Sequence, residues 1–171
     1  YNALNIELKK RFSSNIQFFA TYTWSHSIDD SSDLQTLLKP QDNNNFRAER
    51  SDSLFDQRHR FVFSGIIGAP DSWKSGSMIK RFMHGFTFAP IIEYGSGRPF
   101  NILAVGDNNG DFQSTNERPT VRTDGSLCAT GVDANCFQGV FPLSGNLGRN
   151  MGITRNYFSV DARLTKKIRI G

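Results

Sequence analysis

YNALNIELKKRF (1–12), SSN (13–15) and IQFFATYTWSHSIDD (16–30) make up the opening stretch, which decides the fold. Apolar and polar residues alternate along both arms, as they do when successive side chains of a strand point to opposite faces. Each arm keeps this pattern for about ten to twelve residues, the length that a tilted strand needs to cross a bilayer. The short middle segment predicts that the two arms pair as an antiparallel hairpin.

The second arm carries a bulky, uncharged row on one face. The row ends in an aromatic pair and consists of Ile16, Phe18, Ala20, Tyr22 and Trp24. A row of this kind suits the core of a soluble β-sandwich, and it also suits contact with lipid. Its length and its aromatic end favour lipid, because Tyr and Trp concentrate where a membrane meets water.

The same alternation recurs in three later segments. Five strands are therefore expected, at about residues 1–12, 16–28, 57–69, 82–95 and 157–168. The connections are short, long, medium and long, and the long ones are polar segments at about 29–56 and 97–156. Outer-membrane barrels alternate short periplasmic turns with long extracellular loops. We therefore predict an all-β fold, an antiparallel meander of about five long transmembrane strands that is part of a larger barrel.

Pro90 lies inside the fourth expected strand. Proline has no N–H to donate to a neighbouring strand. The sequence therefore predicts a bulge or a locally missing hydrogen bond at this position.

Composition allows either an ordinary soluble domain or a transmembrane barrel, and it argues against a helical membrane protein and a nucleic-acid-binding protein. The 171 residues are 37% hydrophobic with a mean hydropathy of −0.44, and no run of eighteen apolar residues occurs, so a transmembrane helix is not expected. The net charge of +4 is spread over strands and loops, which argues against nucleic-acid binding. The chain starts inside a strand, without Met or a signal peptide, and stops as a strand finishes. We therefore expect both ends to be cuts through a larger protein.

Two cysteines, Cys128 and Cys136, lie close together in a segment rich in Gly, Asn and Asp. Their spacing predicts a local disulfide, which would suit an oxidising surface. The alternative is a pair of free thiols. A zinc site is not expected, because no histidine lies near them in the sequence.

Asp107, Asn109 and Asp111 place oxygen-bearing side chains at alternate positions, as a loop around calcium requires. The pattern departs from an EF-hand, because the sixth position is Phe112 rather than Gly and the twelfth is Arg118 rather than Glu. The alternative is an Asx-rich turn without metal. A bound calcium would brace the loop rather than catalyse, and no other cofactor is expected.

The remaining polar residues do not form a catalytic pattern. His26 and His59 fall at the ends of adjacent expected strands, near Asp29, Asp30 and Asp56, and a surface pair without function is favoured over a metal site. No Ser or Cys stands in a nucleophile pattern and no phosphate-binding glycine loop is present, so an enzyme is not expected.

Four runs of the sequence are informative together: YNALNIELKKRFSSNIQFFATYTWSHSIDD (1–30), FDQRHRFVFSG (55–65), YGSGRPFNI (94–102) and GRNMGITRNYFSVDARLTKKIRIG (148–171). They resemble the C-terminal barrel of TonB-dependent outer-membrane receptors, specifically the Oar-like group, which carries an N-terminal carboxypeptidase-regulatory-like domain. The D-x-N-x-D segment followed by Asn116-Glu117-Arg118-Pro119 is also similar to a loop of that group. The resemblance implies a barrel of about 22 strands, plugged by an N-terminal domain and driven by the TonB system. The plug and the TonB-contacting segment are not part of this sequence.

These observations lead to three functional hypotheses. The first is a TonB-dependent outer-membrane receptor or transporter, for which the chain supplies barrel wall and ligand-facing extracellular loops. Its partners would be outer-membrane lipid, the TonB system through regions outside this chain, and an extracellular ligand that the sequence does not identify. The alternatives are a secreted all-β binding or adhesion module and a passive porin.

Overall fold

The computed structural model describes residues 1–31, 39–128 and 144–168. The chain divides into two compact units. The sheet unit comprises Ala3–Ser25, Gln57–Ser96 and Asn156–Gly171, and the loop unit comprises Tyr1–Asn2, His26–Asp56 and Gly97–Arg155. Each unit is described by itself below.

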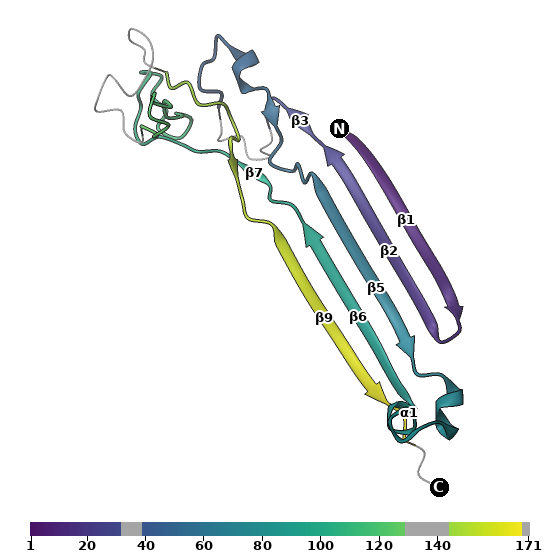
Figure 1. The fold of residues 1–171 in the computed structure, drawn as a ribbon. Helices are drawn as coiled ribbons and strands as arrows, with labels where there is room; N and C mark the ends of the chain where they lie inside the picture. The colour runs from purple at the N-terminus through teal and green to yellow at the C-terminus, as the bar shows by residue number, and fades with distance from the viewer. Residues whose placement is uncertain (32–38, 129–143, 169–171) are drawn as a thin grey trace. The chain divides into compact units, whose positions relative to one another are not determined.

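Five long strands form the sheet unit and confirm the predicted fold class. They lie side by side in chain order, as Figure 1 shows: β1 (Asn2–Ser13), β2 (Ile16–His26), β5 (His59–Gly68), β6 (Phe86–Gly95) and β9 (Tyr157–Lys166). The pairs β2–β5, β5–β6 and β6–β9 are all antiparallel. Each strand has 10 to 12 residues, which matches the length needed to span a bilayer with a tilt. The sheet is open, with β1 and β9 at its edges.

The turn between β1 and β2 has two residues rather than the expected three. Ser13 is the last residue of β1, and the turn consists of Ser14 and Asn15. Both have positive φ, 52° and 65°. This is the signature of a type I′ turn, whose twist matches the twist of the two strands it joins.

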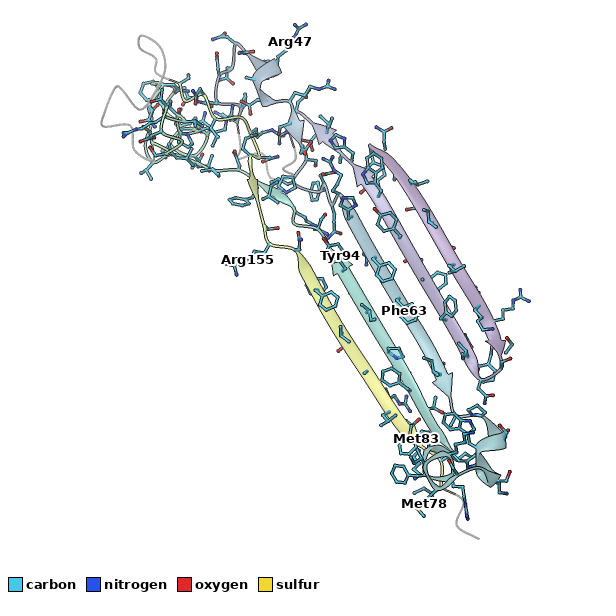
Figure 2. All side chains as sticks on the ribbon, in the orientation of Figure 1. Arg47, Phe63, Met78, Met83, Tyr94 and Arg155 are labelled. Atoms are coloured by element: carbon cyan, nitrogen blue, oxygen red, sulfur yellow. The ribbon has the colours of Figure 1, made fainter. Side chains whose placement is uncertain are left out.

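The strand register places the apolar side chains of four strands on one face. The rows that run across β2, β5, β6 and β9 are Tyr22, Phe61, Tyr94 and Phe158; Ala20, Phe63, Ile92 and Val160; and Ile16, Ile67, Phe88 and Leu164. Figure 2 shows Phe63 and Tyr94 extending from β5 and β6. The opposite face is mixed and carries the charged residues Arg60, Glu93, Asp161 and Arg163. The predicted alternation is therefore preserved across the sheet.

At Pro90 the pairing of β5 with β6 is interrupted, but the register of the two strands does not shift. The register of β5 and β6 runs to Ser64 and Ile91, omits the next two pairs and resumes at Ile67 and Phe88. Because the offset is the same on both sides of the gap, the strands contain no bulge there. The locally missing hydrogen bond, one of the two predicted possibilities, is the one that occurs.

The fourth strand begins later than expected. The strand expected at 82–95 starts at Phe86, because α1 (Met78–Met83) includes Phe82 and is preceded by the 3-10 helix η2 (Asp71–Ser75). Gly85, with φ +82°, follows the helix and takes the left-handed conformation that commonly ends helices. Residues 82 and 83 are therefore helical, and residues 84 and 85 form the turn that leads into β6. None of the helices described in the structure is long and apolar enough to span a membrane.

Short elements order the two long connections, which were expected to be largely irregular. The two-residue strands β3 (Ile28–Asp29) and β4 (Ser51–Asp52) pair with each other, as do β7 (Pro99–Phe100) and β8 (Gly152–Ile153). A 3-10 helix, η1 (Phe46–Glu49), precedes β4. The strand expected at 16–28 therefore ends at His26, and Ile28 belongs to β3 instead.

The β1–β2 turn gives a stability prediction. Ser14→Asn should raise the free energy of unfolding by about 0.5 kcal/mol, because Asn tolerates positive φ better than Ser does. Ser14→Val should lower it, because a branched Cβ is strained in this conformation. Urea unfolding of the refolded protein in detergent measures both changes, and equal stability of the two variants would contradict the type I′ assignment.

Candidate functional site

Polar and charged side chains fill the interior of the loop unit. Among the described residues of the whole chain, only two hydrophobic ones, Ala104 and Cys128, are buried, and both belong to this unit. Its buried charged residues are Glu49, Asp56, Glu117, Arg118 and Arg149. Buried charges are costly unless they are paired or hydrogen-bonded, so their partners determine how the loops are held.

Arg118 and Glu49 form a two-pronged ion pair that joins the two long connections. The Arg118 Nη1 and Nη2 atoms donate to the two Glu49 carboxylate oxygens at 2.7 and 2.9 Å. Both side chains are 5% exposed. Arg118 Nε also donates to the Leu147 carbonyl, and Gln41 N–H donates to Glu49 Oε1. All three guanidinium nitrogens of Arg118 and both carboxylate oxygens of Glu49 therefore have hydrogen-bond partners, as a buried ion pair requires.

Arg149 makes a second connection between the same segments. Its Nε donates to the Glu49 carbonyl at 2.6 Å, and its Nη2 donates to both the carbonyl and the carboxylate of Asp29. The next residue, Asn150, donates from Nδ2 to the Asp52 carbonyl. The side chains of Arg149 and Asn150 therefore donate hydrogen bonds to backbone carbonyls about one hundred positions earlier in the chain, and these bonds hold the two segments together.

A cavity of about 200 Å³ lies beside these pairs. Its wall combines apolar and polar side chains: Asp30, Ser31, Lys39, Pro40, Phe46, Glu49, Leu54, Asn101, Asn116, Arg118, Arg149 and Asn150. The volume is below the roughly 300–1,000 Å³ of a typical small-molecule site. It can therefore accept one chemical group of a larger ligand.

The structure brings two of the three predicted calcium ligands together and adds a third carboxylate. One oxygen each of Asp107, Asp111 and Glu117 lie within 4.8 Å of one another. Asn109, the other predicted ligand, accepts the Asp111 N–H at its Oδ1 and donates to the Gln41 carbonyl. The sequence pattern does not predict Glu117 as a ligand, because an EF-hand has its Glu at the twelfth position and Glu117 is the eleventh residue from Asp107.

Phe112 takes the conformation that its position in the loop demands. It is the sixth residue from Asp107, where an EF-hand has glycine for a sharp turn, and its φ is +63°. Its side chain is 93% exposed. The missing glycine therefore does not prevent the turn.

Glu117 is the least satisfied carboxylate of the loop unit's described part. Its side chain is fully buried, and neither of its carboxylate oxygens has a hydrogen-bond partner among the described residues. The pKa of Glu117 is raised from 4.5 to about 7, chiefly by burial and also by the Asp111 and Asp107 carboxylates, against the opposing effect of Arg118. The ionised form is thus held in an unfavourable environment.

The histidines have separate partners. His26 Nε2 lies 2.9 Å from Asp52 Oδ1, and His59 Nδ1 lies 2.8 Å from the Tyr22 hydroxyl. Of the carboxylates expected nearby, Asp29 binds Arg149, and Asp56 accepts the Ser27 N–H. These contacts explain His26 and His59 without a metal.

Cys128 is buried, and its Sγ accepts a hydrogen bond from Arg122 Nε at 2.8 Å. The predicted partner, Cys136, lies outside the described residues. The disulfide between them therefore stays a prediction.

The apolar face of the sheet unit lacks a second layer within the described part of the chain. On the edge strand β9 the side chains of Phe158, Val160 and Leu164, which belong to this face, are more than half exposed. A soluble sandwich would bury such a face against another sheet. One row across this face, near one end of the strands, is wholly aromatic and includes Tyr22, Tyr94 and Phe158. An aromatic row in this position is typical of a face that crosses a membrane.

A family model described as an outer membrane beta barrel domain matches residues 1–171. The chain belongs to this family. No curated protein and no solved structure matches the chain. Family membership places this outer-membrane barrel domain in the outer membrane of a Gram-negative bacterium, with lipid as a partner. The exposed apolar face is then the lipid-facing one, and the charged face lines the barrel interior.

Barrels of this kind have about eight strands or more, so the open five-stranded sheet of this barrel domain needs further strands to close.

The Arg118–Glu49 pair gives a prediction for the loop unit. Arg118→Met should lower its stability by about 3–5 kcal/mol, because it leaves the buried Glu49 carboxylate without its cation. The double variant Arg118→Met/Glu49→Leu should lose less than the single one. Hydrogen exchange of loop-unit amides in the intact barrel measures the loss.

Arg47→Met is the matched control, because Arg47 is exposed on η1 and extends away from it in Figure 2. Equal protection in Arg118→Met and Arg47→Met would show that the pair does not hold the loops.

Proposed function

We propose that this barrel domain is part of a TonB-dependent outer-membrane receptor of the Oar-like group, which binds a bulky extracellular ligand and transports it inward. The observation that carries the proposal is the loop unit. Two long connections fold together around buried ion pairs and leave a cavity, whereas a simple pore needs no such construction. The resemblance of the sequence runs to that receptor group supports the same conclusion.

In this mechanism the loop unit makes the first contact with the ligand. The cavity beside Arg118 and Arg149 is too small for a whole bulky ligand, so it would take one group while the exposed loop surface contacts the rest. Both arginines are committed to carboxylates and carbonyls, so they shape the cavity rather than offer a free charge. A plug rearrangement driven by TonB, in regions outside this chain, would then release the ligand inward.

Transport rather than catalysis is proposed for the loop unit. The described residues around the cavity include no serine or cysteine placed beside a histidine base, which covalent catalysis would need. The buried residues Glu49, Arg118 and Arg149 that line the cavity have structural partners. Ligand capture needs only shape and hydrogen-bonding groups, and the cavity wall offers both.

The lipid-facing assignment predicts unequal effects of one substitution on adjacent residues. Ala20 and Thr21 are near the middle of β2 and belong to opposite faces. Ala20→Arg should lower the unfolding free energy in a bilayer by about 2–4 kcal/mol, because it places a charge at the depth of the hydrocarbon core. Thr21→Arg, its matched control, should have far less effect. Reversible urea unfolding in lipid vesicles measures both, and similar losses would contradict the assignment.

Planar-bilayer recording of the complete protein tests the receptor against the passive porin. A plugged receptor should show almost no conductance and should bind the purified periplasmic domain of TonB in calorimetry. A porin should show stable open channels and no TonB binding. Open channels without TonB binding would overturn the proposal while leaving the barrel assignment intact.

A further inference from the structure

The carboxylate cluster of the loop unit has a geometry that one metal ion can satisfy. Oxygens of Asp107, Asp111 and Glu117 lie within 4.8 Å of one another. Calcium binds oxygen ligands at about 2.3–2.6 Å, so two of its ligands can be up to about 5 Å apart. A single ion can therefore touch all three carboxylates.

Glu117 is an independent sign of a missing ligand. It is fully buried, both of its carboxylate oxygens are unpartnered among the described residues, and the neighbouring Asn116 Oδ1 is unpartnered as well. The nearest cation in sequence, Arg118, directs its guanidinium to Glu49 and to the Leu147 carbonyl. A buried carboxylate with no partner is strongly unfavourable, and a bound cation removes that cost.

Backbone amides hold the other two carboxylates in place. Asp107 accepts N–H groups from Gly110, Asp111 and Phe112, and Asp111 accepts one from Gln113. A carboxylate oxygen has more than one lone pair, so these bonds orient the groups and leave capacity for an ion. The site is thus largely preorganised.

We propose that residues 107–117 bind one calcium ion through the carboxylates of Asp107, Asp111 and Glu117, with Asn116 Oδ1 as a further oxygen ligand. An all-oxygen set with three carboxylates suits calcium, because magnesium usually keeps several of its waters and zinc favours nitrogen or sulfur. Asn109 stays beside the ion as a support for Asp111.

The ion would brace both long connections. The amide of Asn109 donates to the Gln41 carbonyl, the amide of Asn116 donates to the Pro40 carbonyl, and Arg118 binds Glu49. Three links to the other connection therefore start from the calcium loop or from the residue directly after it. Calcium would fix the wall of the cavity that Asn116 and Arg118 line.

Calorimetric titration of the complete protein in detergent with calcium chloride, in the presence of magnesium, tests the proposal. We expect a site with a Kd of about 0.1–1 mM, the range of extracellular calcium modules. Glu117→Gln keeps the side-chain size and should weaken this site by at least about 10-fold. Asp124→Asn, which neutralises an exposed carboxylate of the same unit, is the control and should leave the site unchanged.

Thermal unfolding separates a metal ligand from a merely buried acid. In EDTA, Glu117→Gln should unfold at a higher temperature than the parent protein, because it removes an unpartnered buried charge. In excess calcium the order should reverse. The proposal is wrong if the same protein has the higher unfolding temperature in EDTA and in excess calcium, or if the parent and Glu117→Gln bind calcium equally. This holds whether or not the protein binds TonB.

Discussion

Backbone hydrogen bonding between neighbouring strands is the constraint on which the sheet depends. Lipid offers no partner to a backbone N–H or C=O, so every strand that crosses it must pair with its neighbours in register. The register observed from β2 to β9 satisfies this requirement and at the same time aligns three apolar rows on one face. A slip of one residue would turn those rows into the barrel interior, so backbone pairing and lipid contact select the same register.

Pro90 shows how much disturbance this arrangement tolerates. The pairing with β5 is lost around it, yet the offset is identical on either side and the pairing with β9 continues through Ala162. Gly65 lies at the gap, opposite Phe18 on β2, and the Phe63 ring lies over it. Phe18 and Phe63 also stack, with ring centroids 6.0 Å apart. Aromatic packing beside the gap therefore offsets part of the lost hydrogen bonding.

The loop unit is held together by side chains rather than by backbone pairing and apolar rows. It has almost no apolar interior among its described residues, and its segments are held by charged side chains that bind carboxylates and carbonyls. Interactions of this kind depend on direction, so they fix the shape of a cavity wall better than an apolar contact would. They also leave Glu117 as a buried charge without a protein partner, which makes it the exception in an otherwise satisfied network.

The alternation of apolar and polar residues with a period of two is a local property of the chain. The sequence by itself therefore determined the five long strands, their order and their apolar faces. The prediction was wrong at residues 82–85, where Phe82 fits either a strand or a helix and belongs to α1. Pairings such as Glu49 with Arg118 and Asp29 with Arg149 were decided by the tertiary structure alone, as was the place of Glu117 beside Asp107 and Asp111. The reason is physical: strand faces repeat along the chain, whereas these partners meet only after distant segments have folded together.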